Sequence, residues 1–345
     1  MRIIHVFSSG ISNINGITNV IERLSMYQKK QGHDVCTIDI KKEKAIRLIS
    51  EFKPEIVSFH GLYYFDYLRI ALFLNTHCIP YVIQFHGGAS SDNYRKSKLK
   101  KRIANLLFFN RFIKNASSTV YLNDGEYNKS IFKCFNLPFF IVPNGIDTRE
   151  SVSLSNHRGI SFLFFSRIDI YGKGLDVLAE VIKRLSNNNL SESIRFVFYG
   201  HIYDSSKNYF NQFSGNFVEY KGTVFGKDKD DAFEASDIVI LPSRSEGMPL
   251  TILEAFSYGR PVIVTPETNM GDLVSEHNLG WVTNLTISDL YSTIVRAINE
   301  FKKDREGYLL RCFEISKSFS WDSIANTTIR EYDSIVKRYH SNRPN

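Results

Sequence analysis

The chain has 345 residues, enough for two domains of ordinary size, and its 43% hydrophobic and 23% charged residues exclude a disordered protein. Four scattered cysteines argue against a zinc site or a disulfide framework and favour a reducing cytoplasm. No apolar run approaches the roughly 18 residues of a spanning helix, and the first residues are too few for a signal peptide. We therefore expect a cytoplasmic protein, soluble or peripheral at the inner face of the membrane, with a net charge of +7.

In chain order, the first half alternates short apolar runs with segments of helical periodicity. The first run leads into a helix that begins near Thr18 and that Gly32 ends. Strands separated by helices indicate a doubly wound parallel sheet. The strands that we expect are residues 2–7, 34–38, 56–59, 81–85, 119–122 and 139–142.

The second half repeats this pattern, with strands expected at residues 160–165, 194–198, 217–220, 238–241, 261–264 and 281–282. The break should follow Asp147, in the polar stretch 148–158, where apolar spacing lapses. The fold class is therefore α/β, with Rossmann-like domains at residues 1–150 and 151–320. We expect the active site in the cleft between them, and a last helical segment within residues 321–345.

The most informative stretch lies between the predicted strands 238–241 and 261–264. Pro249 marks the start of a helix there, and Gly259 marks its end. Glu246 then lies in the loop before the helix, and Glu254 lies about one turn inside it. The helix start is a ready anion site, and both carboxylates could accept hydrogen bonds from hydroxyl groups. The layout fits a nucleotide sugar, with an anion site lined by Gly247, Met248, Pro249, Leu250 and Thr251.

Two cations stand at the start of the second half. Arg167 ends a predicted strand, and Lys173 follows six residues later in a glycine-flanked loop before a helix. Breaking a glycosidic phosphate bond leaves negative charge on the departing diphosphate, so fixed cations at that place would stabilise the transition state. The alternative is a surface pair at a loop, which the downstream motif makes the weaker interpretation.

Together these segments resemble the retaining glycosyltransferases of family 4, which have the GT-B fold. The resemblance rests on the Glu-x7-Glu spacing of Glu246 and Glu254 and on the segment from Arg167 to Gly174. It implies that Glu246 contacts the donor sugar, that Glu254 contacts the ribose, and that Arg167 and Lys173 bind the diphosphate. It also implies a C-terminal helix that returns to the N-terminal domain. We expect a reaction that requires no metal or other cofactor.

The first half offers weaker candidates. Gly16 ends a loop after the first strand, where the family usually has two adjacent glycines and this chain has Asn15 before it. The loop either approaches the donor phosphate or is a plain strand-to-helix turn. His86, in a Gln-Phe-His-Gly-Gly segment at a strand end, resembles the family histidine beside the donor sugar, although a lone histidine is more often structural. His60, at the end of the preceding strand, is a weaker candidate near the acceptor.

Other patterns are ambiguous or misleading. Asp228-Lys229-Asp230 matches a metal-binding D-x-D, but we interpret it as the acidic start of a helix, so no metal is predicted. Gly200 stands where the family often has a Gly-x-Gly turn, and the second glycine is missing. With Gly222 and Val224 this segment is predicted to shape the pocket for the base.

A basic segment, which includes Arg95, Lys96, Lys98, Lys100, Lys101 and Arg102, precedes apolar residues that run to Phe112. It fits an anionic membrane surface and equally a solvated helix face with a buried aromatic side. No nucleic-acid-binding motif accompanies the charge.

The function that we expect is transfer of a hexose or N-acetylhexosamine, with retention, from a nucleotide sugar to a saccharide or lipid-linked saccharide. A UDP-sugar is favoured over GDP-mannose, and O-antigen or capsule synthesis in bacteria is the expected setting. The alternatives are a nucleotide-sugar epimerase of the same fold, a silent binding subunit, and an oxidoreductase. The last is disfavoured because no complete G-x-G-x-x-G follows either first strand.

Overall fold

The computed structural model describes residues 1–9, 16–91, 94, 98–155, 159–186, 193–203, 206–213 and 217–341. The chain divides into two compact units. The first unit comprises Met1–Gly145 and Ser320–Asn345, and the second comprises Ile146–Phe319. Each unit has its own parallel sheet, so the predicted α/β fold with two Rossmann-like halves is confirmed.

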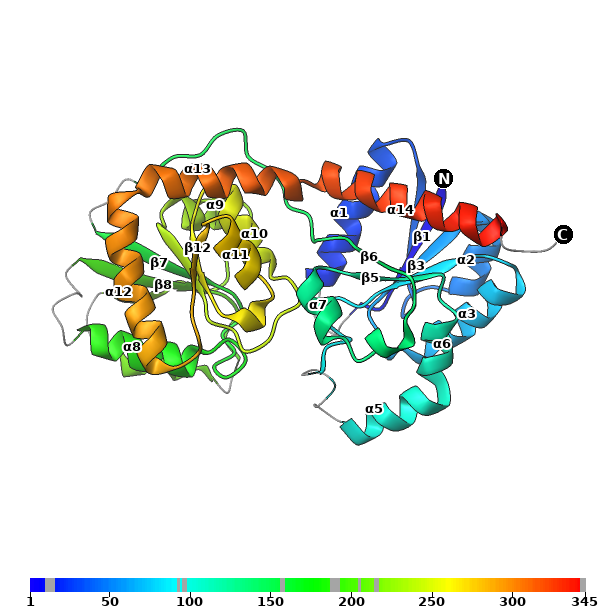
Figure 1. Cartoon of the computed structure of the whole chain (residues 1–345), viewed down its shortest axis with the longest axis horizontal. Helices are drawn as coiled ribbons and strands as arrows, with labels where there is room; N and C mark the ends of the chain where they lie inside the picture. The colour runs from blue at the N-terminus through cyan, green and yellow to red at the C-terminus, as the bar shows by residue number, and fades with distance from the viewer. Residues whose placement is uncertain are drawn as a thin grey trace. The chain divides into compact units, whose positions relative to one another are not determined.

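The first unit is built on a six-stranded sheet with the order β2-β1-β3-β4-β5-β6. All of its strand pairs are parallel, and most strand positions are buried, since helices cover both faces (Figure 1). The strands are β1 (Arg2–Phe7), β2 (Asp34–Asp39), β3 (Ile56–His60), β4 (Tyr81–Gln84), β5 (Ser118–Tyr121) and β6 (Phe139–Ile141).

The helices of the first unit lie in two layers. The long C-terminal helix α14 (Trp321–Ser341) packs against α1 (Gly16–Lys30), so the end of the chain returns to the unit that contains its beginning, as predicted (Figure 1). The other helices are α2 (Ala45–Phe52), α3 (Phe65–Thr76), α5 (Lys98–Ala104), a π-helical turn (Asn105–Phe109), α6 (Asn110–Lys114) and α7 (Asp124–Lys129).

The second unit repeats the architecture, with the strand order β12-β11-β10-β7-β8-β9. Its strands are β7 (Ile160–Phe165), β8 (Ile194–Tyr199), β9 (Val218–Tyr220), β10 (Ile238–Leu241), β11 (Val262–Val264) and β12 (Gly280–Val282). Its helices are α8 (Leu175–Ser186), α9 (Lys227–Glu234), α10 (Leu250–Ser257), α11 (Gly271–Glu276), α12 (Ile287–Lys303) and α13 (Arg305–Ser316). Among the described residues, no helix is both long and apolar enough to cross a bilayer.

The boundaries of the units differ from the predicted domain limits by a few residues. The backbone N–H of Ile146 donates to the carbonyl oxygen of Phe319 at 2.8 Å, where the two connecting segments run side by side. Gly145 lies directly against the ring of Trp321, and a Cβ atom added there would be 2.3 Å from it. The polar residues after Ile146 line a cavity of the second unit, which is why the division precedes the polar stretch rather than lying inside it.

Candidate functional site

The connection between β10 and α10 contains the predicted carboxylate Glu246. The helix begins at Leu250, and Pro249 is its N-cap, with φ −70° and ψ 122°. Pro249 therefore lies one position before the helix, whereas we expected it to be the first helical residue. Gly259, with φ +69°, follows the helix, as its permissive backbone suggests. Glu246 therefore lies in the loop at the carboxyl end of a central strand, which is where ligands bind in open parallel sheets.

Glu246 forms an ion pair with Lys173. The Lys173 Nζ and Glu246 Oε1 atoms are 2.5 Å apart, and the two side chains are only 10% and 17% exposed. Lys173 comes from the loop between β7 and α8, so the ion pair joins the loops that follow two neighbouring strands. The structure thus places two of the predicted site residues together, with charges of opposite sign in one partly desolvated position.

Close packing and a second cation fix the loop of Lys173. Gly174 has φ +68°, and a Cβ atom added there would lie 2.1 Å from the carbonyl oxygen of Pro242. The backbone N–H of Arg244 donates to the carbonyl oxygen of Gly172 at 2.9 Å. The Arg244 guanidinium forms two hydrogen bonds with the Asp176 carboxylate, at 2.7 and 2.8 Å. Arg244 and Asp176 are positioning residues that the sequence analysis missed.

The backbone of Glu246 is fixed from the other side. Its N–H donates to the carbonyl oxygen of Glu267 at 3.0 Å, and its own carbonyl oxygen accepts from Asn269 Nδ2 at 2.7 Å. Asn269 has φ +57°, a conformation that asparagine tolerates better than most residues. Asn269 was also missed, because nothing in the local sequence relates it to a loop more than twenty residues earlier.

Arg167 lies apart from this ion pair. Its side chain is exposed and donates to the Tyr203 hydroxyl at 3.4 Å. Within the described part of the chain, no hydrogen bond or ion pair joins Arg167 to Lys173 or Glu246. The residue before it, Ser166, touches Gly200 so closely that a Cβ atom on Gly200 would lie 1.8 Å from the Ser166 carbonyl oxygen. The strand ends of β7 and β8 are therefore packed backbone to backbone beside Arg167.

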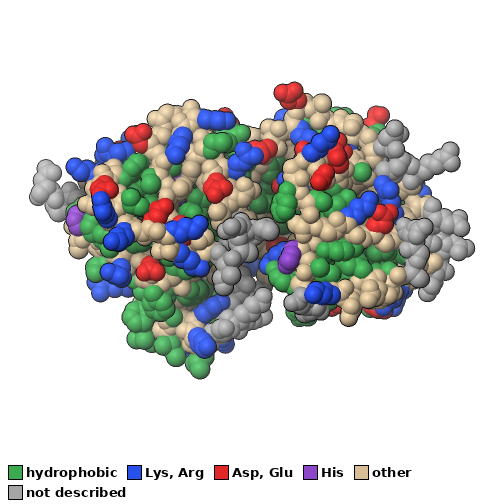
Figure 2. Space-filling view, turned by 180° about the vertical axis from the view of Figure 1, so that it is seen from behind, with side chains coloured by type: hydrophobic (Ala, Val, Ile, Leu, Met, Phe, Trp, Pro, Cys, Tyr) green, Lys and Arg blue, Asp and Glu red, His purple; other side chains and the backbone are tan. Residues whose placement is uncertain are grey.

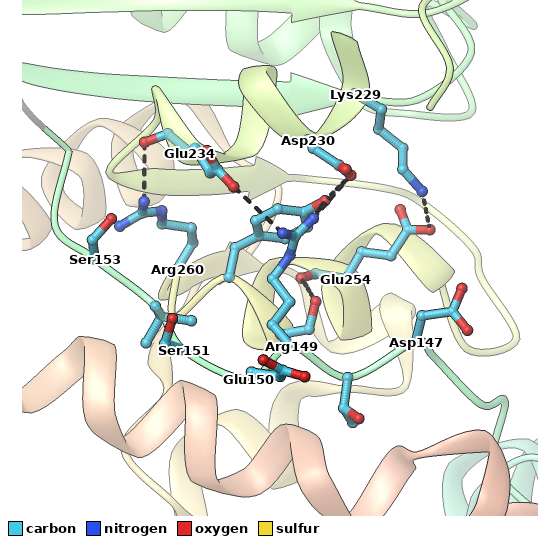
Figure 3. Close-up of a pocket in the computed structure, with 14 residues that line it drawn as sticks. Asp147, Arg149, Glu150, Ser151, Ser153, Lys229, Asp230, Glu234, Glu254 and Arg260 are labelled. Atoms are coloured by element: carbon cyan, nitrogen blue, oxygen red, sulfur yellow. Dashed lines mark hydrogen bonds and ion pairs between the residues drawn. The ribbon is translucent and has the colours of Figure 1, made fainter. Parts of the chain in front are cut away.

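Glu254 lies in a different environment, a polar cavity of about 650 Å³ within the second unit (Figure 3). Its carboxylate pairs with Lys229 at 3.1 Å. Burial raises the pKa of Glu254, and the nearby Lys229 ammonium opposes that rise. Lys229 was missed, because we interpreted the segment around it as the acidic start of a helix. Asp228 and Asp230 do lie in the first turn of α9, as that interpretation predicts.

The remainder of this cavity is a network centred on Arg149 (Figure 3). The Arg149 guanidinium lies 3.6 Å from the ring centroid of Tyr258 and 2.9 Å from an Asp230 carboxylate oxygen. The Tyr258 hydroxyl in turn donates to Asp230. Every one of these residues belongs to the second unit, so the network ties the segment after Ile146 to α9 and α10.

The residues that we predicted to shape a pocket for the base lie at and after the ends of β8 and β9. The Gly222 carbonyl oxygen accepts from the Gly200 N–H at 2.8 Å, and the Gly200 carbonyl oxygen accepts from the Tyr220 hydroxyl at 2.9 Å. These bonds connect the two turns that we expected to act together. Val224 is half-buried in the loop that leads to α9.

In the first unit, His86 has φ +49°, which is uncommon for a residue with a side chain and is frequent at functional sites. The loop is held by Glu126, whose carboxylate accepts from the Gly87 N–H at 2.5 Å and from the Leu122 N–H at 2.7 Å. Glu126 lies in the first turn of α7 and was missed, because nothing in the local sequence relates it to the loop of His86. Gly16 is the first residue of α1, and residues 10–15 of the predicted phosphate loop lie outside the described residues.

Three histidines of the first unit form a continuous hydrogen-bonded row. His60 Nδ1 lies 2.9 Å from His86 Nε2, and His60 Nε2 lies 2.8 Å from His5 Nδ1. His5 Nε2 lies 2.8 Å from Gln28 Oε1. Burial lowers the pKa of His5 and of His86 to about 4, and it lowers the pKa of His60 as well. Both His86 and His60 were candidates, whereas His5 and Gln28 were not.

Across the ranges that the structure describes, no three histidine, cysteine, aspartate or glutamate side chains are grouped so that they could bind an ion.

Two family models match the chain. The model described as glycosyl transferases group 1 matches residues 159–300, and the model described as glycosyltransferase family 4 matches residues 40–150. An uncharacterized glycosyltransferase of Methanocaldococcus jannaschii is 23% identical over 77% of this chain and 71% of its own length. A galactosyltransferase of Escherichia coli, named for UDP-Gal and a GlcNAc-diphosphoundecaprenol acceptor, is 28% identical over 51% of each chain.

Solved structures share the fold over almost the whole chain. A glycosyltransferase of Rickettsia africae superposes with a TM-score of 0.76 at 14% identity, covering 97% of this chain and 98% of that one. Anabaena HepE in complex with UDP superposes with a TM-score of 0.70 at 16% identity, covering 97% and 100% of the two chains.

Proposed function

The chain belongs to the glycosyltransferases of family 4, with the GT-B fold, and from this premise we propose that it moves a hexose or N-acetylhexosamine from a nucleotide sugar to a saccharide acceptor with retention. The observation that carries the proposal is the ion pair of Lys173 with Glu246, at the strand ends where the family resemblance expects the donor phosphate and sugar.

The chemistry needs a cation that meets the charge leaving with the diphosphate and an acceptor for the sugar hydroxyl groups. In the proposed mechanism Lys173 and Arg167 bind the diphosphate, and the first-turn amides of α10, those of Leu250 and Thr251, add donors. Glu246 accepts a hydrogen bond from a donor-sugar hydroxyl, and Glu254 accepts from the ribose. The acceptor hydroxyl enters on the face that the phosphate leaves, and the leaving phosphate accepts its proton. No metal or other cofactor takes part.

A UDP-sugar is the donor that we propose. Support comes from the E. coli relative named for UDP-Gal and from the fold shared with HepE, whose structure contains UDP. The same relative is named for an undecaprenol-linked acceptor, which favours a lipid-linked saccharide of bacterial surface polysaccharide synthesis, as in O-antigen or capsule. His86, whose strained backbone lies at a strand end, would contact the donor sugar.

The donor class is tested by thermal shift with UDP, GDP, ADP and NAD. A nucleotide at 100 times its dissociation constant stabilises the fold by about 2.7 kcal/mol. We expect a shift with UDP. A shift with GDP alone would mean that the donor is a GDP-sugar and not a UDP-sugar. A shift with NAD alone would favour the oxidoreductase.

Catalysis is tested with Glu246→Ala, and Glu276→Ala, an exposed acid on α11, is its control. We expect transfer from UDP-sugar to vanish in the first variant and to be unchanged in the second. Transfer that survives Glu246→Ala would contradict the proposed site.

Product analysis with the donor alone distinguishes a transferase from an epimerase, which would convert the donor sugar without any acceptor. Incubation with EDTA should leave the rate unchanged, because no step uses a metal.

We also propose that the first unit binds an anionic membrane surface. Lys98, Lys100, Lys101 and Arg102 lie in α5, while Arg95 and Lys96 fall outside the described residues. Leu99 and Leu106 are 72% and 76% exposed, and Ile103, Leu107 and Phe108 are exposed beside them, although Phe109 and Phe112 are buried. Figure 2 shows hydrophobic side chains gathered at the lower edge of the first unit, with basic side chains nearby. Such a surface suits lipid headgroups, at about 1 kcal/mol for each basic residue.

Sedimentation with anionic vesicles tests this surface. The triple variant Lys98→Glu, Lys100→Glu and Lys101→Glu should lose binding, as should Leu106→Ser with Leu107→Ser. Leu310→Ser, which changes an exposed leucine of the second unit, is the control. If the wild-type protein does not sediment with these vesicles, the membrane proposal is wrong.

A further inference from the structure

The row Gln28–His5–His60–His86 crosses the first unit from a helix to a strand-end loop. Gln28 belongs to α1, His5 to β1, His60 to the end of β3, and His86 follows β4. Side chains alternate along a strand, so His5 points away from the apolar face that contains Ile4 and Val6. Gln28 and His5 are completely buried, and His60 is 2% exposed.

Each ring in this row carries one proton. Burial disfavours the imidazolium form of all three histidines, so the rings are neutral at neutral pH. A neutral imidazole has one N–H donor and one bare nitrogen that accepts. His5 and His60 each use both nitrogens in the row, so each must donate on one side and accept on the other.

This requirement makes every ring donate in the same direction along the row, and the atom that Gln28 presents at the end of the row decides which direction that is. Gln28 presents Oε1, which can only accept, so His5 donates from Nε2 and accepts at Nδ1. His60 then donates from Nε2 to His5 and accepts at Nδ1, and His86 donates from Nε2 to His60. Nδ1 of His86 is left bare. The opposite direction requires the Gln28 amide to turn over, so that Nε2 donates to His5 and every ring changes its tautomer.

The far end of the row is held in a fixed place. His86 has φ +49°, and the next residue, Gly87, is bonded to the buried Glu126 carboxylate. Since the His86 backbone and the partner of its Nε2 are both fixed, the remaining variable at this ring is which nitrogen carries the proton. The Gln28 amide determines this proton position through the two rings that lie between it and His86, those of His5 and His60.

We propose that Gln28 is a positioning residue that fixes the tautomer of His86 through His5 and His60, so that His86 presents a bare Nδ1 as an acceptor for a substrate hydroxyl. The assignment of the ligand as a sugar hydroxyl rests on the proposed function. The tautomer itself does not, because it follows from the hydrogen bonds within the first unit.

The direct test is ¹⁵N NMR of the histidine side chains in the variant Gln28→Met. The control is Gln31→Met, because the wild-type Gln31 side chain donates to Asp322, which lies outside the row. We expect wild-type His5, His60 and His86 to carry their protons on Nε2. Gln28→Met removes the acceptor, so His86 should show both tautomers, while Gln31→Met should resemble the wild type. A proton on Nδ1 of wild-type His86, or an unchanged tautomer in Gln28→Met, would overturn the proposal.

The kinetic test separates positioning from a structural effect. In Gln28→Met we expect kcat for sugar transfer to fall about twofold to tenfold, since only molecules with the correct tautomer are competent. KM for the nucleotide sugar should change little, and circular dichroism should match the wild type. If the tautomer mixes while kcat stays unchanged, the substrate role of His86 is wrong. If the protein transfers no sugar at all, the NMR result still decides the tautomer assignment while the proposed function fails.

Discussion

At the scale of single residues, the ion pair of Lys173 and Glu246 is the feature most sensitive to substitution, because each charged group is compensated by the other in a mostly buried position. Removing one partner leaves an uncompensated charge in a position that is at most 17% exposed. We expect Lys173→Met and Glu246→Gln each to lower the free energy of unfolding, and the double variant to be more stable than either.

Urea unfolding of the four proteins gives the coupling energy directly. Lys183→Met, which breaks an exposed pair with Glu180 on α8, is the control and should cost less than about 1 kcal/mol. All three site variants should lose transfer by about 100-fold or more, because the cation or the hydroxyl acceptor is gone. Strictly additive losses of stability would mean that the two side chains do not form a pair in solution.

At the scale of elements, two glycines lie at the ends of β7, β8 and β9, and they differ in how closely the neighbouring backbone approaches them. Gly200 has φ +146° and would place a Cβ atom 1.8 Å from the Ser166 carbonyl oxygen, whereas Gly222 has φ +77° with nothing within 4 Å. Gly200→Ala must therefore push the strand ends apart beside Arg167. Gly222→Ala introduces only the backbone strain of an alanine at φ +77°, because no neighbouring atom is close.

We expect Gly200→Ala to lower the free energy of unfolding by about 3 kcal/mol or more, and Gly222→Ala to lower it by about 1 kcal/mol. Urea unfolding of both variants measures the difference. The tight contact would be refuted by equal costs for the two substitutions.

The strands were predictable because a buried parallel strand is a short continuous apolar run, and all twelve lie within one or two residues of their predicted limits. The helix after Glu246 was predictable from Pro249 and Gly259. What could not be predicted were contacts between loops distant in sequence, such as Arg244 with Asp176, Asn269 with Glu246, and Glu126 with Gly87. Each of these depends on how strands are ordered in the sheet, and residue type alone does not encode that order.

At the scale of the whole molecule, the two units should differ in their response to acid, since the histidine row lies in the first unit alone. The pKa of His5 is about 4 in the folded protein against 6.5 for a free side chain. Between these values the unfolded chain binds more protons than the folded one, so stability falls as the pH falls from 6.5 toward 4. At pH 5 His5 alone lowers the free energy of unfolding by about 2 kcal/mol, and His60 and His86 act in the same direction.

Buried carboxyls act in the opposite sense. Burial raises the pKa of Glu126 in the first unit and of Glu254 in the second, so these two groups favour the folded state as the pH falls. Each unit thus has one such glutamate among the described residues, while four histidines of the first unit, His5, His33, His60 and His86, have lowered pKa values and oppose it there. The net loss of stability on acidification should therefore be larger in the first unit.

The chain's two tryptophans allow each unit to be followed separately, because Trp321 lies in the first unit and Trp281 in the second. In Trp281→Phe, fluorescence reports the first unit, and in Trp321→Phe it reports the second. We expect the urea midpoint of the first unit to fall clearly between pH 7 and pH 5 and that of the second to fall less. Equal shifts in the two variants would show that the histidine row is not held neutral by the fold, because the rings of that row lie in the first unit and must gain protons on unfolding.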